Sequence, residues 1–145
     1  MKETIEVGRS VGPLVFGLAR EEVLSLLGTP SAEYKDIDAI FYDDPFMLCG
    51  FDSATDRLTS VEVTPASGFK LNDKELPASV PALRRLLSKE GVSLVAEKSD
   101  PDLHFDPKLR VMVFVQEGAV DAVSFGVLFD EAGDTILWPE DHPTS

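Results

Sequence analysis

A chain of 145 residues is long enough for one domain with its own hydrophobic core, without a disulfide or a metal to hold it together. Its 26 acidic and 13 basic residues give a formal net charge of −13, which disfavours nucleic acids and anionic lipid and favours basic partners. The same charge can also serve solubility alone. No apolar run approaches the ~20 residues of a membrane span and the N-terminus lacks a signal-peptide core, so we expect a cytoplasmic protein.

The first half of the chain predicts a short strand, one helix and three further strands. Residues 4–7 alternate polar and apolar side chains, and Gly12-Pro13 marks a loop. A helix over residues 19–27 ends at Gly28 because Pro30 cannot continue it. One face of this helix is apolar, formed by Val23, Leu24 and Leu27. The strands that follow lie between Asp-rich turns, at residues 39–42, 46–51 and 58–63.

The second half predicts the same order of elements. A strand at residues 69–71 precedes a helix that Ser79 caps and Gly91 ends. The apolar face of this helix is formed by Val80, Leu83, Leu86 and Leu87. The strands predicted after it are at residues 94–98, 103–105, 109–115, 120–129 and 135–138.

The two halves, about residues 4–66 and 67–138, align at a nearly constant offset. An offset of 63 places Gly91 on Gly28, Phe105 on Tyr42 and Asp106 on Asp43, and an offset of 62 places Val123 on Val61. This regularity favours a duplicated strand–helix–antiparallel-strands unit. The alternative is that two α+β segments of equal length align loosely without a common origin.

These elements predict an α+β fold in a single domain of residues 1–145, with a tail at 139–145 that includes His142. The short turns favour antiparallel pairing, and two helices cannot cover both faces of seven or eight strands. We therefore expect two helices packed on one face of a curved antiparallel sheet, with the other face free to receive a partner.

The pattern Gly12-Pro13, Phe16-Gly17, Glu21-Glu22-Val23 and Leu26-Leu27-Gly28-Thr29-Pro30 resembles the opening of small bacterial α+β domains. These include the SmpA/OmlA (BamE-like) group, which is similar in fold to the repeats of β-lactamase inhibitor protein, and predicted immunity partners of secreted toxins. The resemblance implies a motif that serves the fold and a function in protein binding. It implies no catalytic residue for this chain.

Few residues suggest chemistry. Cys49 lies in an apolar run beside Asp43, Asp44 and Asp52, where a thiol is a small buried hydrophobe and lacks the cationic setting of a nucleophile. No nucleophile elbow, phosphate loop or dinucleotide fingerprint occurs. The segment Asp52 to Asp56 lacks the Gly and the terminal Glu of a calcium loop.

Two clusters of residues have side chains that could form a site. Strand alternation places Asp102, His104 and Asp106 on one side, where they could hold a metal only weakly, so we interpret them as a solvated strand face. The acidic residues Asp36, Asp38, Asp43 and Asp44 could support acid–base chemistry if one were desolvated, but aspartates are also what tight turns require. Trp138 and the aromatic residues Phe41, Tyr42, Phe46 and Phe51 could form a binding surface. At alternating strand positions, about half of them should instead belong to the core.

The sequence thus favours a non-enzymatic protein-binding module, an acidic immunity or inhibitor protein for a basic protein partner. We expect no cofactor, no metal, no nucleic acid and no membrane among its ligands. The alternative is a small-ligand-binding protein or a small enzyme with a pocket between sheet and helices. A structural or envelope-assembly role is a third hypothesis.

Overall fold

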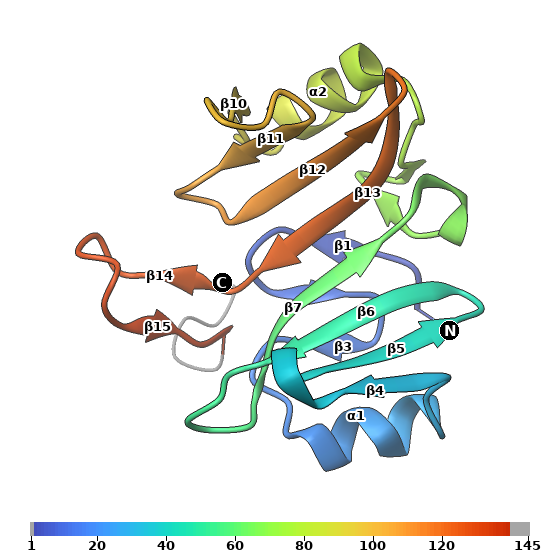
Figure 1. The fold of residues 1–145 in the computed structure, drawn as a ribbon, viewed down its shortest axis with the longest axis vertical. Coiled ribbons are helices and arrows are strands. Elements are labelled where there is room, and N and C mark those ends of the chain that lie inside the picture. The colour runs from blue at the N-terminus through green and yellow to red at the C-terminus, as the bar shows by residue number, and fades with distance from the viewer. Residues whose placement is uncertain (1, 140–145) are drawn as a thin grey trace.

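The computed structural model describes residues 2–139, so His142 and most of the predicted tail lie outside the described residues. Its main element is an eight-stranded, fully antiparallel sheet (Figure 1). From one edge to the other, its strands are β10 (Val95–Ala96), β11 (Leu103–Asp106), β12 (Val111–Gln116), β13 (Ala119–Gly126), β7 (Leu58–Val63), β6 (Phe46–Phe51), β5 (Ala39–Asp43) and β4 (Ala32–Tyr34). The predicted α+β class and antiparallel pairing are confirmed.

The two halves of the chain meet at the centre of this sheet. In the first half, α1 (Arg20–Leu27) precedes β4 to β7, and in the second half, α2 (Val80–Ser88) precedes β10 to β13. The strands β7 and β13 pair antiparallel, with Val63 opposite Val123 and Val61 opposite Phe125. Each half therefore contributes four consecutive strands on its own side of the β7–β13 pair (Figure 1).

One face of the sheet is covered by both helices. Side chains alternate across a strand, so residues paired in register share a face. One such row runs across six strands: Tyr42, Met47, Val63, Val123, Val113 and His104. The Tyr42 hydroxyl donates to Gly28 O at the end of α1 (2.8 Å), and Arg84 of α2 contacts His104 Nδ1 (3.1 Å). Both helices thus contact the same row.

Between the helices, small sheets complete this layer. They are formed by β1 (Ile5–Glu6), β2 (Ser10–Val11) and β3 (Leu14–Val15), and by β8 (Lys70–Leu71) and β9 (Lys74–Glu75). The predicted loop at Gly12-Pro13 is confirmed and forms the turn of the β2–β3 hairpin. Gly12 has φ +60°, and a Cβ there would lie 2.7 Å from the Phe69 ring, so only glycine fits.

The two helices are held differently. In α2, the Ser79 hydroxyl accepts from the Ala82 N–H (3.3 Å) as predicted, and Leu83, Leu86 and Leu87 are buried. In α1 only Val23 is fully buried, whereas Leu24 and Leu27 are half-buried. The N-cap Ala19 has no side-chain acceptor, and its N–H donates to the Glu22 carboxylate instead (2.9 Å). Neither helix is long and apolar enough to cross a bilayer, nor is any other helix within residues 2–139.

The strand predicted over residues 120–129 is divided. The chain leaves the sheet after Gly126, where the Val127 N–H donates to Thr59 O (2.8 Å), and continues as β14 (Leu128–Phe129), which pairs with β15 (Ile136–Leu137). The predicted offset of 63 is also one residue wrong in this part of the sheet. Tyr42 lies on the helix-covered face, whereas Phe105 lies on the opposite one, so these two residues do not occupy equivalent places in the sheet.

Candidate functional site

The face of the large sheet away from the helices carries a row of apolar side chains with two polar ones, Glu62 and Ser124, at its centre. Its members are cross-strand neighbours on six strands and form what we call the open face: Phe41, Leu48, Glu62, Ser124, Met112 and Phe105. They are half-buried, apart from Met112, which is 37% exposed. The row ends at Val95, which is 50% exposed, and Phe46 packs edge-on against Phe41 with ring centroids 5.1 Å apart. Apolar side chains gathered on an open sheet face are typical of interaction sites.

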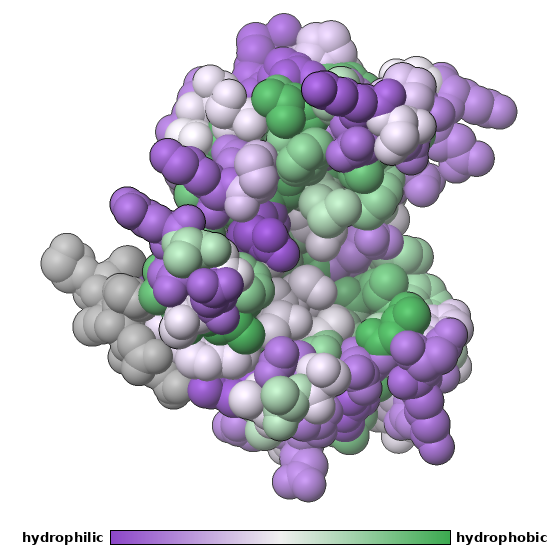
Figure 2. Space-filling model, turned by 60° about the vertical axis from the view of Figure 1, so that its left-hand side comes forward, coloured by the Kyte–Doolittle hydropathy of each residue, from purple (hydrophilic) through white to green (hydrophobic). Residues whose placement is uncertain are grey.

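A hollow of about 690 Å³ lies on this side of the molecule. Figure 2 shows it across the middle of the molecule, with apolar surface on either side and polar side chains around it. Its lining includes residues of both halves and of the β14–β15 hairpin, and no residue of α1 or α2. The hollow is therefore not the pocket between sheet and helices that the ligand-binding alternative requires.

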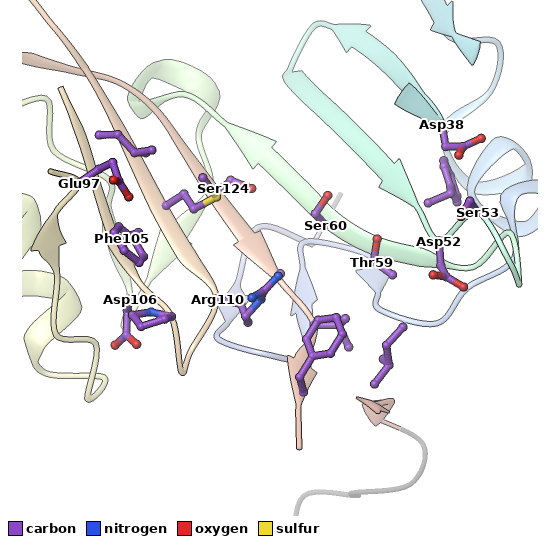
Figure 3. A pocket seen from close by; sticks show the side chains of 18 residues that line it. Asp38, Asp52, Ser53, Thr59, Ser60, Glu97, Phe105, Asp106, Arg110 and Ser124 are labelled. Atoms are coloured by element: carbon purple, nitrogen blue, oxygen red, sulfur yellow. The ribbon is translucent and has the colours of Figure 1, made fainter. Parts of the chain in front are cut away.

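Acidic groups outnumber basic ones in this hollow. Its lining includes three carboxylates, of Asp38, Asp52 and Glu97, and one guanidinium, of Arg110, which lies over the Phe129 ring (4.7 Å). Asp106 also borders the hollow, but its carboxylate is bound to backbone N–H groups. In Figure 3, Glu97 and Asp52 come from opposite ends of the hollow, with Ser124 and Ser60 between them on the central strands.

Small residues keep the floor of the hollow low. Gly50, Ser60 and Gly126 are consecutive across β6, β7 and β13. A Cβ at Gly50 would come within 2.5 Å of the Ser60 hydroxyl oxygen, and one at Gly126 within 3.3 Å of the Arg110 Cβ. These close contacts between strands disfavour larger side chains at Gly50 and Gly126. Because only small residues occupy the centre of the face, the hollow remains open.

Glu62 is the one charged member of the open face. It is half-buried between Leu48 and Ser124, and within residues 2–139 no hydrogen-bond donor or cation pairs with its carboxylate. Burial raises the pKa of Glu62 above its ordinary value, and the nearby Asp121 carboxylate raises this pKa further. The folded protein thus holds a carboxylate whose ionisation opposes folding.

Replacing Glu62 by glutamine should therefore stabilise the protein at neutral pH. The pKa of Glu62 is higher in the folded state than in the unfolded state, where it is near 4.5. Below pH 4.5 the group is neutral in both states and costs no stability, and the destabilisation by its ionisation is complete once the pH has risen above the folded-state pKa. Urea unfolding of wild type and Glu62→Gln at several pH values should show the variant more stable at pH 7, with the difference shrinking towards pH 4. A constant or reversed difference would contradict this assignment.

Asp102, His104 and Asp106 do not come together as a metal site in the part of the chain that the structure describes. Asp106 and His104 do share one side of β11, but this side faces α2, and Asp106 is only 6% exposed. The prediction of a solvated face is wrong for Asp106, because its carboxylate accepts from the N–H groups of Ser93, Lys108 and Leu109 (2.8–3.0 Å). Within residues 2–139 no three His, Cys, Asp or Glu side chains lie close enough to hold a metal.

The other residues considered from the sequence lie in the core, in turns or at a strand end. Cys49 is fully buried on the helix-covered face, where burial raises the pKa of its thiol to about 12. Asp36, Asp43 and Asp44 are exposed in turns or at a strand end, and Asp38 is half-buried.

The aromatic residues divide between the two faces. Tyr42 and Phe51 are buried, Phe41 and Phe46 lie half-buried on the opposite side, and the Arg57 guanidinium lies over the Trp138 ring (4.1 Å). The sequence did not single out Glu62, Phe105, Met112 or Ser124. The period-two alternation of residues 58–63 was the one available signal, since it predicts a wet face.

The comparisons with known proteins leave the family open. The chain shows no significant match to a protein-family model, to a curated protein or to a solved structure.

Proposed function

We propose that this chain is a non-enzymatic protein-binding module, of the immunity or inhibitor type, that receives a basic protein on its open face. The observation that carries the proposal is a continuous row across six strands, from Phe41 to Phe105, with no element of residues 2–139 packed as a layer upon it. An antiparallel sheet usually exposes polar side chains on its solvent face, so apolar ones are a departure that binding explains.

Charge supports a basic partner over a second copy of the chain. Two copies, each with a formal charge of −13, repel one another at low salt. A basic protein is attracted to the same surface, and the carboxylates of the hollow and Glu62 provide local negative potential beside the apolar side chains. Steered association of this kind is fast and sensitive to salt.

We also propose that the sheet is a duplication, with its pseudo-two-fold axis at the β7–β13 pair. The register supports offsets of 62 for Val61 and Val123 and of 64 for Tyr42 and Asp106. The recurrence of one helix followed by four strands agrees with this origin. On this proposal both halves contribute equivalent surfaces to one binding face.

The small-ligand alternative rests on the hollow alone. Its volume of about 690 Å³ falls within the range of ligand pockets, ~300–1,000 Å³. Its carboxylates, however, take part in local turns: Asp52 accepts from Thr55 (2.8 Å) and Glu97 from the hydroxyl of Ser99 (3.3 Å). We therefore favour a protein partner.

The proposal is tested with tagged protein as bait in extracts of the organism that encodes it, at low and high salt. The variant Phe105→Ala/Met112→Ala removes apolar open-face contacts, and Val15→Ala/Leu26→Ala is the matched control because these exposed side chains lie on β3 and α1. We expect wild type and control to retain one basic protein at low salt. The open-face variant should bind that purified protein at least about tenfold more weakly.

A partner that binds the open-face variant and the control equally would contradict the proposed surface. An acidic partner whose binding does not weaken with salt would contradict the electrostatic part of the proposal.

A further inference from the structure

We infer that Glu62 is the anchor of the interface: a lysine or arginine of the partner, flanked by apolar side chains, pairs with its carboxylate at the centre of the open face. This inference rests on the proposed function and names the residue that selects the partner's chemistry. It is carried by the position of Glu62, by its surroundings and by the lack of a partner for its carboxylate within residues 2–139.

The position of Glu62 is that of an interface centre. It lies on β7, which with β13 forms the central pair of the eight-stranded sheet, and it pairs with Ser124 of β13 on one side and Leu48 of β6 on the other. Beyond these neighbours the row continues to Phe41 on one side and to Met112 on the other. Apolar surroundings that exclude water are the setting in which a central charged contact contributes most to binding.

The lack of a partner is the second observation. The half-buried Arg20 pairs with Asp56 (2.8 Å) and Lys70 with Glu3 (3.4 Å), whereas no cation within residues 2–139 reaches Glu62. Its cross-strand neighbour Ser124 is uncharged, so it cannot form an ion pair with Glu62. Ser124 is also small and leaves space above the β7–β13 pair. A half-buried, unpaired carboxylate opposes folding, and such local costs are typical of functional positions.

The occupant follows from these surroundings. A small cation alone would leave Leu48 and Met112 exposed to water. An apolar segment alone would bury the unpaired Glu62 carboxylate, which costs free energy. A segment with a basic residue between apolar residues satisfies both requirements. Serine 124 admits the long side chain of arginine or lysine over the central strands, beside the hollow whose floor is Ser60 and Gly126.

The probe is the peptide acetyl-Leu-Arg-Leu-amide, with acetyl-Leu-citrulline-Leu-amide as its uncharged counterpart. Each is titrated into ¹⁵N-labelled full-length protein and followed by amide shifts at low salt. We expect the arginine peptide to shift amides of Leu48, Glu62 and Ser124. Glu62→Gln should lower its affinity about fivefold, to that of the citrulline peptide, a size expected for one partly desolvated ion pair.

The matched control is Glu75→Gln, which removes the same charge from the exposed strand β9, outside the large sheet. This variant should bind the arginine peptide within about twofold of wild type. Equal effects of the two substitutions, or equal binding of the two peptides, would overturn the anchor while leaving an open-face partner possible. Absence of open-face shifts with either peptide, or self-association of the protein through this face in sedimentation, would overturn the anchor and the proposed function together.

Discussion

Replacing Phe125 by alanine should destabilise the protein by about 3–5 kcal/mol, the cost of a large cavity in a packed core. Phe125 is fully buried on β13, where it is paired with Val61 of the first half and Val111 of the second. The lost ring would leave a void beside the junction of both halves. Urea unfolding followed by circular dichroism measures this change as a lower midpoint at an unchanged slope.

The control for this prediction is Met112→Ala on the adjacent strand. Met112 is a large side chain on the opposite face and is 37% exposed, so its truncation should cost less than about 1 kcal/mol. A similar loss for the two variants would mean that the open face is packed in solution, and this would contradict both the assignment of faces and the proposed binding surface.

Replacing Asp106 by alanine should cost about 2 kcal/mol, because three backbone N–H groups lose their acceptor. One carboxylate oxygen holds the turn at Lys108 and Leu109, and the other holds Ser93 after α2, so the substitution affects the β11–β12 turn and the helix end together. Thermal unfolding should show a lower midpoint for Asp106→Ala.

Two further variants make the Asp106 prediction specific. Asp106→Asn keeps one acceptor oxygen and should lose less stability than the alanine variant. Asp102→Ala is the matched control, because Asp102 is exposed just before the same strand, and it should unfold at nearly the wild-type temperature. Equal losses for Asp102→Ala and Asp106→Ala would show that the three bonds to Asp106 contribute nothing measurable.

The sequence predicted those helices and strands that are determined by nearby residues, such as caps, turns and apolar spacing. The helix α2 follows from the Ser79 cap and from leucines spaced along one face. The strand β7 follows from period-two alternation, and β5 and β6 follow from apolar runs between Asp-rich turns. The small strands β2 and β3 were missed, because two residues on either side of a Gly-Pro turn carry no periodicity.

The candidate site was not predictable because it depends on register between distant strands. The position of Glu62 beside Ser124 is fixed by pairing of β7 with β13, sixty residues along the chain, and a shift of one residue would turn each side chain to the other face. The alignment of Tyr42 with Phe105 shows the same sensitivity. Tyr42 is buried under the helices, whereas Phe105 lies half-buried on the open face.

The way in which the N-terminal strand is joined to the second half has a consequence for cooperativity. Residues of the first strand do not stay within their own half: Lys70 N–H donates to Glu3 O (2.9 Å), and Thr4 forms a parallel bridge with Lys70. Dividing the chain near residue 66 would place these partners on different fragments and leave the backbone N–H and C=O groups that pair β7 with β13 without partners. The two halves should therefore melt as one unit, in a single two-state transition, and neither fragment should fold alone.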